Sequence, residues 1–151
     1  MGALVRSAVL GLAAGGRSSV ALAVPVQAAT RGHDGPGARV ARVLTGLAVL
    51  GEVVGDKLPS TPSRLAAPQI AGRLLAGVVG AAALALVHRD RPGVVVVAAL
   101  AGGAGAFAGS VVGASWRQWA ADDGPDVLRP DVRAALVEDA VVLTAARALA
   151  R

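Results

Sequence analysis

An uncharged stretch of twenty-three residues, 93–115, constrains the fold of this chain more than any other feature. It reads GVVVVAALAGGAGAFAGSVVGAS. A helix rises about 1.5 Å per residue, so this stretch is long enough to cross the roughly 30 Å hydrocarbon layer of a membrane. Trp116, Arg117 and Trp119 follow it, and such residues at the end of an apolar span are typical of the membrane interface. The stretch predicts a transmembrane helix.

The composition of the chain favours the same class of protein. Hydrophobic residues make up 54% and charged residues only 17%, while aromatic residues account for 2% and glycine occurs twenty times. Soluble domains carry about 25% charged residues, and their cores usually use aromatic side chains. Helices in lipid can pack through small side chains instead. We therefore expect an all-α, polytopic transmembrane bundle of four or five short, glycine-rich helices.

One membrane domain, residues 1–151, is expected to hold all of these helices. Their expected ranges are 7–29, 40–56, 67–87, 93–115 and 132–150. The last range contains Glu138 and Asp139, so it either spans or lies at the interface or against protein. In the third range Arg73 is expected to extend toward the lipid headgroups. The connector 58–68 contains three prolines, which exclude a continuous helix.

The N-terminal segment and the orientation of the chain have more than one interpretation. Arg6, an apolar run and the residues 26–29, Val-Gln-Ala-Ala, resemble a cleavable signal peptide. Arg17 interrupts the run and further spans follow, which favours a retained helix. With five spanning helices, five basic residues fall on each side: Arg6, Lys57, Arg64, Arg117 and Arg129 against Arg31, Arg39, Arg89, Arg91 and Arg151. The positive-inside rule then gives no orientation.

Glycines at four-residue spacing are the clearest packing motif. Gly105, Gly109 and Gly113 form GxxxGxxxG inside the best span, and Gly11 and Gly15 repeat the spacing. Residues four apart share a helix face, and glycine lets two backbones approach closely. We expect the triple at 105–113 to pack helices, either within one chain or between copies.

Charged residues inside apolar segments indicate a polar site. Arg17 lies at the middle of the first expected helix, and an unpaired arginine there costs roughly 2.5–3.5 kcal/mol on insertion scales. Glu52 is the expected partner, Asp56 is the second choice, and Glu138 supplies a further acid. In the alternative interpretation, Glu52 and Asp56 only mark the end of a helix at the membrane surface.

The sequence contains no catalytic or metal-binding signature. There is no cysteine, His33 and His88 have no partner histidine at helical spacing, and no nucleotide-binding, zinc-protease or serine-hydrolase motif occurs. The net charge is +5, but the basic residues are scattered between apolar runs, unlike a nucleic-acid-binding stripe. We expect no enzyme, no cofactor, no metal and no nucleic acid.

The chain resembles a family of uncharacterised bacterial membrane proteins, domain of unknown function four-one-two-six. The residues that carry the resemblance are Gly15-Gly16-Arg17, Glu52, Asp56-Lys57-Leu58-Pro59 through Pro68, Ala71-Gly72 and Val137-Glu138. The acidic loop 121–131 and the turn Pro-Ser-Thr-Pro-Ser-Arg depart from it. The resemblance covers nearly the whole chain and implies a polytopic bacterial membrane protein, without implying an activity.

These observations leave two functions open. The first is a non-enzymatic membrane scaffold or interaction protein in the bacterial inner membrane, with the lipid bilayer and further copies of the chain as partners. The alternative is a small transporter or channel that uses Arg17, Glu52 and Asp56 as its polar site. The sequence specifies neither the substrate nor the oligomeric state.

Overall fold

The structure, a computed structural model, describes residues 2–56 and 66–150 and is all-α within them. These residues form six helices and no strand. The helices are α1 (Ala3–Gly16), α2 (Ser18–Ala29), α3 (Pro36–Gly55), α4 (Ala67–Val87), α5 (Pro92–Asp122) and α6 (Asp131–Leu149). Most of the expected proline-containing connector, with Arg64, lies outside the described residues, as does Lys57.

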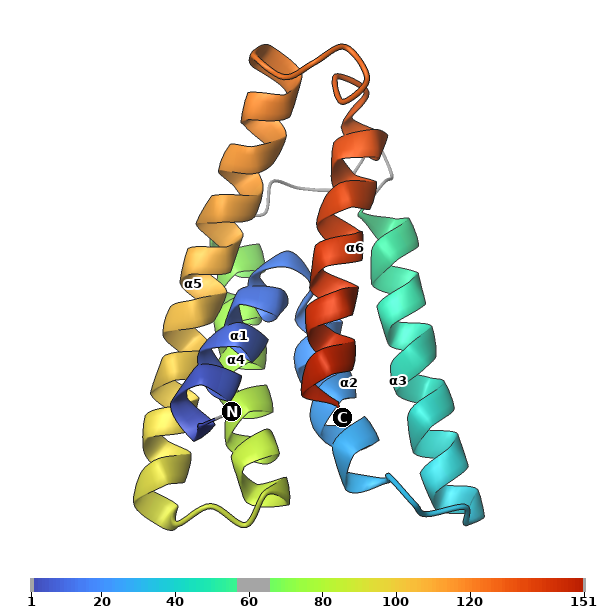
Figure 1. The fold of residues 1–151 in the computed structure, drawn as a ribbon, viewed down its shortest axis with the longest axis vertical. Coiled ribbons are helices and arrows are strands. Elements are labelled where there is room, and N and C mark those ends of the chain that lie inside the picture. The colour runs from blue at the N-terminus through green and yellow to red at the C-terminus, as the bar shows by residue number, and fades with distance from the viewer. Residues whose placement is uncertain (1, 57–65, 151) are drawn as a thin grey trace.

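The expected first helix, 7–29, is two helices that form a hairpin. Arg17 has an extended backbone, with φ of −142° and ψ of 103°, and separates α1 from α2. In Figure 1, α1 runs upward from the N-terminus, the chain turns at about half height, and α2 runs back down. Fourteen and twelve residues give lengths of only about 21 and 18 Å. Each helix is therefore shorter than the roughly 30 Å hydrocarbon layer.

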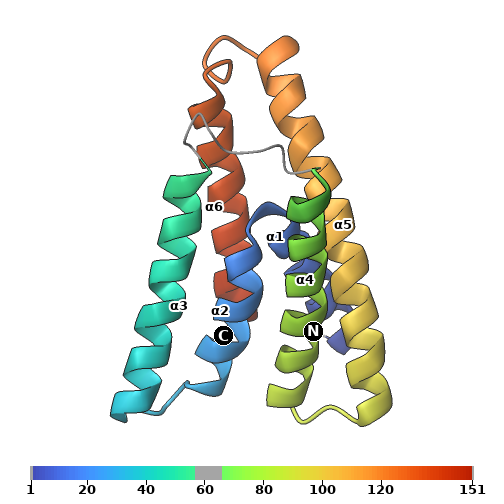
Figure 2. The ribbon, with the colours of Figure 1, turned by 180° about the vertical axis from the view of Figure 1, so that it is seen from behind.

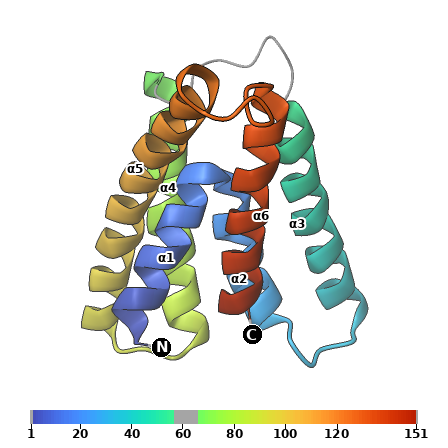
Figure 3. The ribbon, with the colours of Figure 1, turned by 45° about the horizontal axis from the view of Figure 1, so that its top comes forward.

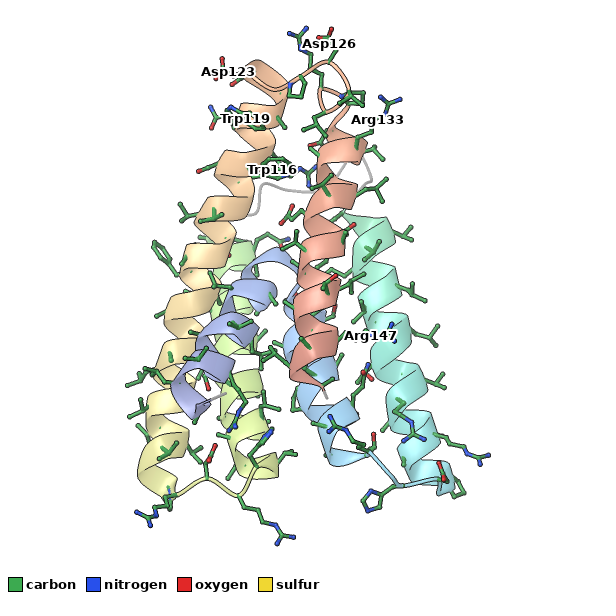
Figure 4. The ribbon with its side chains drawn as sticks, viewed as in Figure 1. Trp116, Trp119, Asp123, Asp126, Arg133 and Arg147 are labelled. Carbon is green, nitrogen blue, oxygen red and sulfur yellow. The ribbon has the colours of Figure 1, made fainter. Side chains whose placement is uncertain are left out.

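The other four helices lie close to their expected ranges. Pro36, Pro68 and Pro92 stand in the first turns of α3, α4 and α5, where a missing N–H leaves no broken hydrogen bond. The largest difference is at the end of α5, which continues beyond residue 115 to Asp122. Trp116 and Trp119 therefore lie on the helix itself, near the upper end of the molecule in Figure 4.

The hairpin packs against helices from both halves of the chain. Figure 3 shows α1 beside α4 and α5, and α2 beside α6. Seen from behind in Figure 2, α2 lies between α3 and α4. The largest buried apolar side chains join α1, α2, α4 and α6, and they include Leu10, Val20, Val24, Leu84 and Val142. By contrast, α3 has no buried residue.

Glycines let α5 approach two helices at backbone distance. A Cβ atom added to Gly105 would lie 2.5 Å from the carbonyl oxygen of Ala8, and one on Gly109 would collide with the carbonyl group of Leu12. On another side of α5, Gly102 meets the backbone of Gly77 in α4. Gly113 is also buried. The shared face of Gly105 and Gly109 therefore lies against α1.

Two described helices are long and apolar enough to cross a membrane, namely α4 and α5. Four or five such helices were expected. The N-terminal pair falls short because it is divided at Arg17, and both α1 and α2 remain apolar. Only a third of the residues in the most apolar stretch of α4, and in that of α5, are buried inside the structure. Most of the apolar surface of these two helices therefore faces outward.

Candidate functional site

A buried group of charged side chains surrounds the turn between α1 and α2. We call it the tip cluster; it consists of Arg17, Glu52, Asp56, Arg73 and Asp139, together with Ser18 and Ser19. Its residues come from the hairpin and from α3, α4 and α6. Arg17 is 1% exposed, and Arg73 and Asp139 are each 4% exposed. The centre of the cluster is therefore enclosed by protein, whereas Glu52 and Asp56 at its edge are partly exposed.

The end of α1 is bound by Arg73. The last carbonyl groups of a helix have no partner within the helix and carry partial negative charge. Arg73 donates from Nη1 to the carbonyl oxygens of Gly15 and Gly16, at 2.6 and 2.7 Å. The arginine thus points inward from α4, whereas the sequence predicts that it extends toward the lipid headgroups.

The start of α2 is bound by Glu52. The first N–H groups of a helix lack partners and attract an anion. The backbone N–H groups of Ser18 and Ser19 donate to the two carboxylate oxygens of Glu52, at 2.9 and 2.8 Å. Both serine hydroxyls donate to the same carboxylate, at 2.9 and 2.5 Å. Glu52 therefore caps the helix from a different element of the chain.

Arg17 itself binds two aspartates from different helices. Its Nε and Nη2 lie 2.7 and 2.5 Å from Oδ1 of Asp139, and its Nη1 lies 2.5 Å from Oδ2 of Asp56. Nη1 also donates to the backbone oxygen of Glu52, at 3.1 Å. The expected pairing of Arg17 with the Glu52 carboxylate is therefore wrong, because that carboxylate is bound to the serines. Asp56, the second choice, is a direct partner.

The other predicted acid, Glu138, occupies a neighbouring surface. Its Oε1 would lie 3.3 Å from a Cβ atom added to Gly16, and its side chain lines an apolar groove between α1, α5 and α6. Adjacent residues on a helix point in directions about 100° apart. Asp139 therefore faces Arg17 while Glu138 faces the groove.

Two charged members of the tip cluster, and both of its serines, were missed by the sequence-based site prediction. Asp139 was noted only as a charge inside the last helix, and Arg73 was placed at the membrane surface. One signal was present: Gly15-Gly16 followed by Ser18-Ser19 combines residues that end helices with residues that begin them. That pattern could have located the break, and with it the helix ends that need charged partners.

In the tip cluster, the positively and negatively charged side chains neutralise one another. Two guanidinium groups face three carboxylates, and Arg73 also lies 3.7 Å from Glu52 and 3.8 Å from Asp56. Buried charges are stable only when paired and hydrogen-bonded. Within the described residues, no group of histidine, cysteine or acidic side chains is arranged to hold a metal ion. The geometry fixes the turn of the hairpin in place.

No family model, curated protein or solved structure matched this chain in the three comparisons made.

Proposed function

We propose that this chain is a multi-pass integral membrane protein with an architectural, non-enzymatic role, in which the tip cluster holds a re-entrant helical hairpin inside a glycine-packed bundle. The observation that carries this proposal is that both helix ends at the hairpin turn, and the arginine between them, have charged partners. Arg73 binds the end of α1, Glu52 binds the start of α2, and Arg17 binds two aspartates. A network in which each of these helix ends and charged groups has a partner suits a permanent structural element.

The outer surface supports a membrane location. On α3, Leu44, Leu47 and Leu50 are each about 60% exposed, and Leu100 on α5 is 69% exposed. Contiguous apolar surface of this kind requires a partner, and the hydrocarbon layer of a bilayer covers it from all sides. Irregular backbone at membrane depth is tolerated where protein buries it, as at the enclosed turn around Arg17.

The hairpin also supports an orientation of the chain in the membrane. Figure 1 shows that α1 and α2 return to the same end. Arg6 near the start of α1 therefore joins Arg31 after α2, Arg39 at the start of α3, and Arg89 and Arg91 between α4 and α5. Arg6 also forms an ion pair of 2.8 Å with Asp90. Among the described residues, the opposite end carries fewer basic residues, Arg117, Arg129 and Arg133, of which Figure 4 labels Arg133. By the positive-inside rule, the arginine-rich end is cytoplasmic.

Cysteine labelling tests this topology directly, since the chain has no cysteine of its own. A membrane-impermeant maleimide should label Gly2→Cys and Asp34→Cys only in inverted vesicles, and Asp126→Cys only in intact cells. Labelling of Gly2→Cys and Asp34→Cys from opposite sides would show instead that residues 7–29 cross the membrane once.

Membrane integration has its own test. Because α4 and α5 are long enough to span, washing isolated membranes with alkaline carbonate should leave the protein in the pellet. A peripheral protein of the same membranes serves as the control and should be released. Recovery of this protein in the supernatant would overturn both the membrane location and the topology.

A small transporter is the second candidate, and one observation favours it. Arg17, Glu52 and Asp56 meet at the turn of the hairpin, and transporters use the ends of broken helices at mid-membrane depth to bind substrates. Transport requires the cluster to open, so Glu52→Gln should alter ion or solute flux in reconstituted vesicles while the fold persists. The resemblance to the bacterial family and the association of copies through glycine faces stay predictions.

A further inference from the structure

A groove of about 430 Å³ lies beside the tip cluster, between α1, α5 and α6. Its volume falls in the range of roughly 300–1,000 Å³ that is usual for small-molecule sites. Gly16, Gly109 and Gly113 line it and contribute no side chain, so space remains where the three helices meet. Two other lining residues, Val112 on α5 and Val141 on α6, are 64% and 66% exposed. The groove is therefore open toward the outside of the bundle.

The lining of the groove is almost wholly apolar. Among the described lining residues, only Trp116 and Glu138 carry polar side-chain atoms. The indole N–H of Trp116 is already used, because it donates to the backbone oxygen of Ala134 at 3.1 Å. Glu138 already interacts with other residues of the chain, and Arg117 acts on it electrostatically. A buried water molecule needs two to four polar partners, so this lining favours hydrocarbon over water or a polar ligand.

The groove is also short. Its lining residues run from Gly109 to Trp116 along α5 and from Val137 to Ala145 along α6. Residues rise about 1.5 Å along a helix, so these stretches are about 10 and 12 Å long. A helix with its side chains is about 10–12 Å across, as wide as the groove is long. A spanning helix of a partner therefore cannot lie along the groove, whereas a slim and flexible hydrocarbon chain fits.

We propose that this groove holds one acyl chain of a membrane lipid. The inference rests on the proposed membrane location, because the bilayer then supplies hydrocarbon at the open side of the groove. A gap without atoms loses the dispersion contacts of its walls, and an acyl chain restores them. The bound chain replaces the side chains that the three glycines lack and fills the seam between α5 and α6. Because these walls recognise hydrocarbon, the headgroup of the lipid stays outside and is not selected.

Quenching of tryptophan fluorescence by phosphatidylcholine with brominated acyl chains tests this proposal, with the full-length protein in dodecyl maltoside. The chain has two tryptophans, so Trp119→Phe leaves Trp116 as the reporter in the groove. Replacing both tryptophans with phenylalanine and adding Leu100→Trp gives a reporter on α5 at a 69% exposed position, outside the described lining.

Quenching of Trp116 should saturate as brominated lipid is added, whereas quenching of the Leu100→Trp reporter should rise in proportion to the lipid fraction. Half-maximal quenching of Trp116 should need a lipid fraction about tenfold lower than the Leu100→Trp reporter needs for the same effect. A brominated lipid with a phosphoglycerol headgroup should quench Trp116 equally, because the groove contacts only the chain.

Two variants that fill the groove complete the test, so that one remains if the other fails to fold. Val141→Phe and Val112→Phe each add bulk at the open side of the groove, and each should remove the saturable quenching of Trp116. Val96→Phe is the matched control. Val96 is 60% exposed on α5 and lies outside the described lining, so this change should leave the quenching unaltered.

Proportional quenching of both reporters would overturn the proposal, because the groove would then be ordinary lipid-facing surface. Quenching of the Leu100→Trp reporter without quenching of Trp116 would also overturn it and would indicate that protein covers the groove. Saturable quenching that survives both filling variants would place the bound lipid elsewhere and overturn it too. If the Leu100→Trp reporter is not quenched at all, the proposed membrane location fails with the groove, so the two failures are distinguishable.

Discussion

Replacing Arg17 with glutamine should lower the free energy of unfolding by about 3–5 kcal/mol, the effect expected when a buried ion pair loses one partner. The change removes the guanidinium group that binds both Asp56 and Asp139 inside the protein. Unfolding in mixed micelles of dodecyl maltoside and dodecyl sulfate, followed by tryptophan fluorescence, measures the loss.

A double-mutant cycle identifies the partner. Asp139→Asn combined with Arg17→Gln should show a coupling of at least about 1 kcal/mol, because the two side chains are in direct contact. Coupling between Arg17→Gln and Glu52→Gln should be smaller, since the Glu52 carboxylate is bound to Ser18 and Ser19. A larger coupling of Arg17 with Asp139 than with Glu52 would support the observed geometry. The reverse order would support the pairing that was expected from sequence.

The partly exposed ion pair of Arg6 with Asp90 provides the control for this series. Both side chains are partly accessible, so Arg6→Gln should change the free energy of unfolding by less than about 1 kcal/mol. If Arg17→Gln is tolerated as well as Arg6→Gln, the tip cluster is not a structural element and the architectural proposal fails.

Replacing Gly109 with leucine should destabilise the bundle by about 3 kcal/mol or more, at or beyond the upper end of the usual cost of overpacking. A Cβ atom there collides with the backbone of Leu12, and a helix backbone cannot move aside as a side chain can. Gly109→Ala should already be harmful, because its single added carbon occupies the same position.

Gly51→Leu is the matched control for the packing prediction. A Cβ atom at Gly51 meets nothing within 4 Å, and leucine has the higher helix propensity by about 1 kcal/mol. This variant should therefore be as stable as the original chain or more so. Equal tolerance of leucine at positions 51 and 109, measured in the same micelles, would show that the glycine face of α5 is incidental.

Helix positions were predictable from sequence where a long apolar pattern follows a proline-containing segment. The range 67–87 coincides with α4, and the ranges 40–56 and 132–150 differ from α3 and α6 by a few residues at their ends. In each case a proline-containing segment precedes a long apolar pattern, so local sequence sets the start. Tertiary contacts were not needed for these assignments.

The site was predictable only in part because its geometry depends on contacts across the whole chain. Hydropathy averaged over a whole apolar segment gives no sign of the break at Arg17, and so the range 7–29 was predicted to be one helix. Once the break exists, two helix ends require charged partners, which brings Arg73 inward. Asp139 is 122 residues from Arg17, and no local pattern relates two residues so far apart.

The distribution of the tip cluster along the chain sets an order of assembly. The hairpin is synthesised before α3, α4 and α6, and its turn is satisfied first by Glu52 and Asp56, then by Arg73, and finally by Asp139 of α6. An unpaired arginine is costly within lipid. During synthesis, therefore, the turn has to stay in contact with water or with the insertion machinery until Asp56 at the end of α3 and Asp139 of α6 are in place as the partners of Arg17. Of the described helices, the two that are made first are therefore the last to reach their final positions.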